Sequence, residues 1–109
     1  PFSISKNNNI PLQEGMVFSN EPGYYLEGKF GIRIENLVTI KKKTINRKEL
    51  FKIETLTLAP YDMDLITKNL LTNEELIWIK NYHNIVFKNI SPYLDKNEKS
   101  WLFKEINKL

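Results

Sequence analysis

The hydrophobic pattern of this chain changes its period once, at Ala59-Pro60-Tyr61-Asp62. Before that point apolar and polar residues alternate, which is typical of β-strands. Later in the chain the apolar residues recur at the spacing of α-helices. Strands followed by helices predict an α+β fold. We expect residues 1–60 to form part of a larger domain and residues 61–109 to form a helical C-terminal extension.

The first part of the chain divides into strand candidates separated by polar turns. Pro22-Gly23 closes one of them, and the period-two alternation is clearest just after Phe30. The polar stretch between them reads as a loop, and the lysine-rich stretch further on reads as a charged turn. The expected strands are therefore 2–5, 16–21, 30–40 and 50–58, with loops at 24–29 and 41–48 and an antiparallel hairpin over 30–58.

Two helices are predicted in the second part from their start signals. Thr72 and Glu75 have the spacing of a capping box, in which a hydroxyl at the helix entry pairs with a carboxylate three residues later. Asp95 and Glu98 repeat that spacing before a second apolar run, and Pro92 ends the first helix. The extension is therefore expected to be a pair of helices.

Two glutamates lie in segments that otherwise read as apolar strands. Glu21 precedes Pro22-Gly23, and Glu35 follows Arg33 with one residue between them. A carboxylate removed from water needs a counter-charge or a metal. Period-two spacing puts Arg33 and Glu35 side by side, and Tyr25 could point its hydroxyl into the same cleft. The plainer alternatives are an exposed charge pair on a half-solvated sheet and an ordinary turn.

The exact strings resemble a known family. Ser-Asn-Glu-Pro-Gly-Tyr-Tyr at 19–25 and Phe-Gly-Ile-Arg-Ile-Glu-Asn at 30–36 are similar to the catalytic C-terminal half of Xaa-Pro aminopeptidases (aminopeptidase P), which have the pita-bread metallopeptidase fold. The later strings Leu-Thr-Leu-Ala-Pro-Tyr-Asp, Tyr-His and Ser-Pro resemble the C-terminal extension of the long type of that enzyme. The resemblance implies antiparallel strands from a pita-bread catalytic domain over 1–60, followed by the two-helix tail.

The resemblance also implies roles for individual residues. Glu21 and Glu35 match two glutamate ligands of a dinuclear metal centre, usually manganese, and Arg33 and Tyr25 match residues that line it. The implied substrate is a peptide with proline in second position. The family's two aspartates and ligand histidine have no counterpart here, and His83 lies in the tail. We therefore expect a C-terminal fragment that is inactive without the missing N-terminal half of the enzyme.

A non-catalytic role is the alternative. The chain would then be a remnant or a subunit-contact module, with a possible homodimer. Its contact residues would come from the tail and would be Trp78, Tyr82, Trp101 and Leu102. The competing interpretation is that these side chains pack in an ordinary core.

Composition bounds the remaining classes. The absence of cysteine excludes disulfides, thiolate zinc sites and cysteine nucleophiles, and fits a cytoplasmic protein. No apolar stretch approaches the length of a transmembrane helix, so no membrane partner is expected. The net charge of +3 is concentrated near Lys41-Lys42-Lys43 without interleaved aromatics, so no nucleic-acid partner is expected either.

Overall fold

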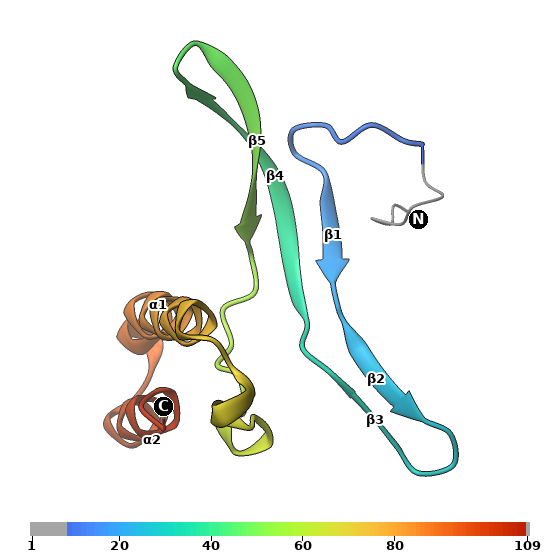
Figure 1. Ribbon diagram of the computed structural model, residues 1–109. Coiled ribbons are helices and arrows are strands. Elements are labelled where there is room, and N and C mark those ends of the chain that lie inside the picture. Colours follow the sequence, from blue (N-terminus) through green and yellow to red (C-terminus); the bar gives the residue numbers. More distant parts are fainter. Residues whose placement is uncertain (1–8, 109) are drawn as a thin grey trace. The chain divides into compact units, whose positions relative to one another are not determined.

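The computed structural model describes residues 9–108, so the strand expected at 2–5 lies outside the described residues. The chain divides into two compact units, with the boundary between Thr57 and Leu58. The first unit contains the strands and the second contains the helices, as Figure 1 shows. The α+β order predicted from the change of period is confirmed.

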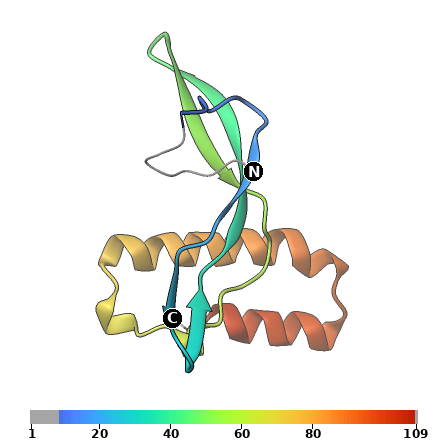
Figure 2. The ribbon, with the colours of Figure 1, turned by 90° about the vertical axis from the view of Figure 1, so that its right-hand side faces the viewer.

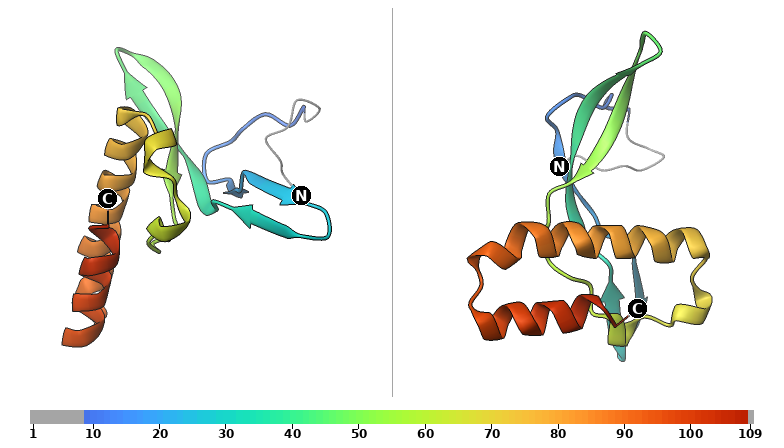
Figure 3. Two further views of the ribbon diagram at one scale, coloured as in Figure 1. Left: turned by 60° about the horizontal axis from the view of Figure 1, so that its bottom comes forward. Right: turned by 90° about the vertical axis from the view of Figure 1, so that its left-hand side faces the viewer.

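The first unit contains two antiparallel sheets. The sheet in the order β1-β4-β5 is built from β1 (Val17–Asn20), β4 (Asn36–Ile45) and β5 (Lys48–Thr55). The second sheet is the hairpin of β2 (Gly23–Leu26) and β3 (Phe30–Arg33), seen clearly in Figure 3. The core of this unit is small and lies between β1 and β4, where Phe18, Val38 and Ile40 are buried.

Three predictions about the strands were wrong. Residues 24–26 belong to β2 rather than to a loop, because their β-forming side chains pair with β3 and the reversal needs only the turn at Gly28, whose φ is +69°. The strand expected over 30–40 is broken between Arg33 and Asn36. The break lies opposite Pro22. Because proline has no backbone N–H, it cannot donate a hydrogen bond to the neighbouring strand at this point.

The third correction concerns the lysine-rich segment. It is not a turn, because β4 continues to Ile45 and β5 begins at Lys48. The reversal is made by Asn46 and Arg47 alone, with φ of 50° and 62°. Two central residues with positive φ make the kind of tight turn whose twist matches that of a β-ribbon.

The second unit is a pair of helices, α1 (Asn73–Ile90) and α2 (Lys96–Ile106), which lie side by side in Figure 2. Three short 3-10 helices accompany them, at Met63–Leu65, Lys68–Leu70 and Ser91–Tyr93. Both predicted capping boxes are present. The main hydrophobic cluster of this unit is formed by the buried residues Tyr82, Val86, Leu102 and Ile106.

The four tail residues named in the sequence thus separate into two kinds. Tyr82 and Leu102 are core residues, whereas Trp78 and Trp101 are 51% and 58% exposed in this chain. Trp78 still contacts the core, because its ring stacks on Tyr82 at 5.6 Å between centroids, and Tyr61 stacks on the same Tyr82 at 4.8 Å. No helix among residues 9–108 is long and apolar enough to cross a membrane.

Candidate functional site

Glu21 and Glu35 lie opposite each other on two neighbouring segments of the chain, in the gap between two strand ladders. Asn20 pairs with Asn36 at the end of one ladder, and Gly23 pairs with Arg33 at the start of the next. Counting inward from both pairs gives the same register, so Glu21 is opposite Glu35. The N–H of Ile34 still donates to the Pro22 carbonyl at 3.1 Å within this break. Like charges directly opposite each other destabilise a sheet unless a cation lies between them.

Arg33 supplies such a cation in this structure. Its Nη1 lies 3.2 Å from Oε2 of Glu21, and its Nε lies 3.8 Å from Oε2 of Glu35. The second oxygen of Glu21, Oε1, accepts a hydrogen bond from the Ser19 hydroxyl at 2.5 Å. The two carboxylates therefore converge on one guanidinium. We call Glu21, Arg33 and Glu35 the glutamate–arginine cluster.

The cluster is exposed in this chain, although its two glutamates lie in segments that read as apolar strands. The side chains of Glu21, Arg33 and Glu35 are 43%, 50% and 44% exposed. Every residue of β2 and β3 is exposed as well. The described strands leave these faces of the sheet uncovered, so solvent screens the charges.

Tyr25 lies on the same face of the sheet as the cluster. It pairs with Gly31, just as Gly23 pairs with Arg33. Because alternate residues share a face, Glu21, Gly23 and Tyr25 on one strand and Gly31, Arg33 and Glu35 on the other form a continuous face. The structure therefore brings together all four residues that the resemblance singled out.

Sequence reasoning missed the neighbours that shape this face. Ser19 and the glycines at 23 and 31 were not singled out as site residues. The signal was present, since all three lie at even spacing from Glu21 or Glu35. What the sequence could not supply was the register across the break at Pro22.

His83 has a structural place, as its position in the tail predicted. Its side chain is 1% exposed. Nε2 accepts a hydrogen bond from the N–H of Tyr61 at 3.1 Å, and Nδ1 lies 3.4 Å from the carbonyl oxygen of Ile106. The neutral ring with its proton on Nδ1 satisfies both contacts, and burial lowers the pKa of His83 below its ordinary value. Both nitrogens are occupied, so His83 is not placed to ligate a metal.

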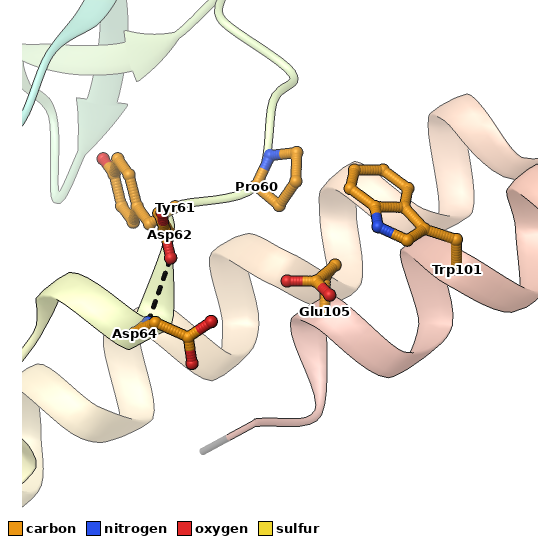
Figure 4. Close-up of a pocket in the computed structure, with 6 residues that line it drawn as sticks. All are labelled: Pro60, Tyr61, Asp62, Asp64, Trp101 and Glu105. Atoms are coloured by element: carbon orange, nitrogen blue, oxygen red, sulfur yellow. Dashed lines mark hydrogen bonds between the residues drawn. The ribbon is translucent and has the colours of Figure 1, made fainter.

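An acidic pocket of about 290 Å³ lies in the second unit. Figure 4 shows the six residues that line it: Pro60, Tyr61, Asp62, Asp64, Trp101 and Glu105. Two of its carboxylates are already paired, because Nζ of Lys108 lies 2.6 Å from Asp64 and 2.7 Å from Glu105. These hydrogen bonds, first that of Asp64, raise the pKa of Lys108. The arrangement fastens the end of α2 to the Met63–Leu65 turn.

Within residues 9–108, no group of three or more His, Cys, Asp or Glu side chains is placed to hold a metal ion. The glutamate–arginine cluster contributes two carboxylates and no more. Carboxylate oxygens suit hard divalent cations. A metal site built on the cluster therefore needs further ligands from outside the described residues.

Comparison with protein families assigns nearly the whole chain. The model described as the C-terminal region of peptidase_M24 matches residues 49–109, more than half of the sequence, and the model of metallopeptidase family M24 matches residues 1–42. The chain belongs to metallopeptidase family M24. Its second unit lies within the region matched by the C-terminal model.

Individual relatives agree with this family. A protein named probable Xaa-Pro aminopeptidase P from Coprinopsis cinerea is 41% identical over 104 residues, which cover 90% of this chain and 17% of that protein. Aminopeptidase P1 from Lotus japonicus is 42% identical over 110 residues, covering 95% of this chain and 17% of that protein. The chain thus spans 17% of the length of these curated relatives.

A solved structure is similar as well. It is the crystal structure of X-prolyl aminopeptidase from Caenorhabditis elegans, described as a cytosolic enzyme with a di-nuclear active site. The match has a TM-score of 0.79 and 30% sequence identity, and covers 96% of this chain and 18% of that one. The predicted resemblance to the C-terminal part of aminopeptidase P, with strands of the pita-bread fold followed by two helices, is confirmed.

Proposed function

We propose that this chain supplies two glutamate ligands, Glu21 and Glu35, to a dinuclear metal site in a Xaa-Pro aminopeptidase. The observation that carries the proposal is their opposed position across the strands, with both carboxylates on one guanidinium. The di-nuclear active site named for the similar worm enzyme supports it. The substrate would be a peptide with proline in second position, as the names of the relatives suggest.

The donor chemistry fits a divalent metal in kind but not in number. Carboxylate oxygens suit Mn²⁺, which we propose as the metal because the family resemblance implies it. Two carboxylates alone are a weak site for a divalent cation. We propose that two aspartates and a histidine come from the missing N-terminal half of the enzyme, and that the chain by itself is inactive.

The bound metals would supply a water of lowered pKa and a polarised substrate carbonyl. Arg33 would hold the two glutamates in fixed directions, since its charge is permanent and its donors are rigidly forked. The Ser19 hydroxyl would fix the rotation of the Glu21 carboxylate through its hydrogen bond. Tyr25, 62% exposed on the same face, could offer its hydroxyl to the bound peptide. We assign Arg33 and Tyr25 these supporting roles in the active site.

A cytoplasmic location is part of the proposal. It rests on the description of the similar worm protein as a cytosolic enzyme and on the absence of cysteine.

The test is a cleavage assay on a Xaa-Pro peptide with added Mn²⁺. The chain is assayed alone and mixed with the polypeptide encoded immediately upstream. We expect activity in the mixture only, and we expect Glu35→Gln, a neutral variant of similar shape, to abolish it. Glu27→Gln in the β2–β3 turn is the matched control and should keep wild-type activity. Activity of the Glu35 variant within a few-fold of wild type would rule out its ligand role.

A second candidate function is a subunit-contact module. It is favoured by the exposed apolar side chains of the second unit, which on α1 include Ile77, Trp78 and Ile85 and on α2 include Trp101 and Phe103. We propose a homodimer through these exposed side chains as the alternative. Light scattering should then give twice the chain mass at micromolar concentration, and Trp78→Ser should halve it. A monomeric wild-type chain would exclude this alternative.

A further inference from the structure

Two glycines lie directly opposite two large side chains on the β2–β3 hairpin. Gly23 faces Arg33, and Gly31 faces Tyr25. All four share the face that carries the glutamate–arginine cluster. Large and small residues thus alternate around this part of the sheet, and each large side chain has a glycine beside it to lie over.

The space above Gly31 is filled by the Tyr25 ring. A Cβ at Gly31 would lie 2.6 Å from Cδ1 and 3.0 Å from Cε1 of Tyr25. Carbon atoms in ordinary contact lie about 3.5–4.0 Å apart. Any side chain at position 31 would therefore push the ring away. An aromatic ring lying over a cross-strand glycine also covers backbone that would otherwise be open.

The space above Gly23 is shared by the two large residues. A Cβ there would lie 2.7 Å from Cγ of Arg33 and 2.8 Å from the hydroxyl oxygen of Tyr25. The two distances bring both atoms to the same small space beside the Gly23 backbone. The hydroxyl end of Tyr25 and the aliphatic part of Arg33 therefore both lie over the backbone of Gly23.

We propose that Gly23 and Gly31 are positioning residues, which seat the Tyr25 ring so that it holds the Arg33 guanidinium between Glu21 and Glu35. The functional meaning rests on the proposed metal-ligand role of the two glutamates. Arg33 is half exposed and has a long flexible side chain, so it needs a lateral support to stay in one conformation. Tyr25 provides that support only while position 31 has no side chain.

The two glycines differ in how well they tolerate a methyl group. At Gly31 the nearest atoms all belong to the exposed Tyr25 ring, which can rotate into solvent. Gly31→Ala is therefore expected to displace the ring with little loss of stability. At Gly23 the carbonyl oxygen of Ile32 lies 3.0 Å from the added carbon, so the backbone must move as well. Gly31→Ala is thus the cleaner variant.

The first readout is the side-chain Nε–H signal of Arg33 in ¹H–¹⁵N spectra of the whole chain. The sequence has two arginines, and Arg47 in the β4–β5 turn serves as an internal reference. We expect Gly31→Ala to shift the Arg33 signal toward that of Arg47 and to remove the cross-peak between the Tyr25 ring and the residue-31 Hα. Gly28→Asn is the matched control, because a Cβ there meets nothing within 4 Å and Asn tolerates a φ of +69°.

A double-mutant comparison separates positioning from general sheet strain. If Gly31→Ala acts through the ring, then adding it to Tyr25→Ala should leave the Arg33 signal where Tyr25→Ala alone puts it. The proposal would be overturned if Gly31→Ala shifts the Arg33 signal by the same amount in the wild-type chain and in the Tyr25→Ala variant. An unchanged Arg33 signal in Gly31→Ala would overturn it too.

The second readout is Mn²⁺ affinity of the chain mixed with its upstream polypeptide, measured by titration without substrate. Residues that orient metal ligands typically change affinity 10- to 100-fold, so we expect Gly31→Ala to weaken binding about 10-fold. If Gly31→Ala displaces the Tyr25 ring but keeps the wild-type Mn²⁺ affinity, the proposed effect on metal binding is refuted. If the wild-type mixture binds no Mn²⁺, the proposed function fails, while the spectra of the chain still decide the positioning of Arg33.

Discussion

His83 gives the sharpest test of the packing in the second unit, because it is the single histidine of the sequence. Replacing it with alanine empties a site that is 1% exposed and removes the hydrogen bond from the N–H of Tyr61 to Nε2 of His83. Truncation of a large buried side chain costs about 2–5 kcal/mol. Loss of a partly buried hydrogen bond adds about 1 kcal/mol. We expect His83→Ala to lower the free energy of unfolding by about 3–6 kcal/mol.

The burial of His83 also makes the stability of the second unit depend on pH. Burial lowers the pKa of His83 in the folded state, so the unfolded state binds the proton more readily as the pH falls below 6.5. Stability is therefore complete above that value and decreases in more acidic solution. Between pH 7.5 and 5.5 the loss is at most about 1.4 kcal/mol for one histidine.

Urea unfolding followed by tryptophan fluorescence measures both effects. Trp78 and Trp101 both belong to the second unit, so the signal reports that unit. Asn84→Ala, the exposed next residue of α1, is the control and should change stability by less than about 0.5 kcal/mol. His83→Gln should flatten the dependence between pH 5.5 and 7.5. An equal slope in wild type and His83→Gln would refute the reasoning, as would a His83→Ala variant as stable as the Asn84 control.

Two further predictions concern local stability. Thr72→Ala removes the capping box of α1 and should cost about 1 kcal/mol of stability in the same urea assay. The side chain of Thr67 makes no cap hydrogen bond, so Thr67→Ala should be near neutral. Equal effects of the two substitutions would contradict the capping account. Ile40→Ala in the fully buried centre of β4 should cost about 2–5 kcal/mol, measured by amide hydrogen exchange of that strand. The exposed Ile45→Ala should leave exchange at the centre of the strand unchanged, and a comparable loss of protection there would count against this core.

Local signals in the sequence predicted the second unit well. The capping boxes at Thr72 and Asp95 depend on residues three positions apart, so they can be read without knowing the tertiary structure. The exposure of Trp78 and Trp101 could not be read in this way. Helical spacing shows which residues share a face, but it does not show whether anything covers that face.

The strands were harder to predict because their pairing is not local. Lys41-Lys42-Lys43 has the composition of a loop but lies in a strand, since its backbone pairs with β5 and its side chains reach solvent. The interruption opposite Pro22 depends on register. The spacing of Arg33 and Glu35 predicted their contact, whereas the opposition of Glu21 and Glu35 required the pairing on both sides of the break.

The central claim is that Glu21 and Glu35 are metal ligands and that the other ligands of the site come from the N-terminal half of the enzyme. Its most direct test is Xaa-Pro peptide cleavage with Mn²⁺, by the chain alone and by the chain mixed with the polypeptide encoded immediately upstream. The account predicts activity only in the mixture, and its loss in Glu35→Gln. Activity of the chain alone would contradict the argument that two carboxylates are too few, and an inactive mixture would contradict the proposed catalytic role.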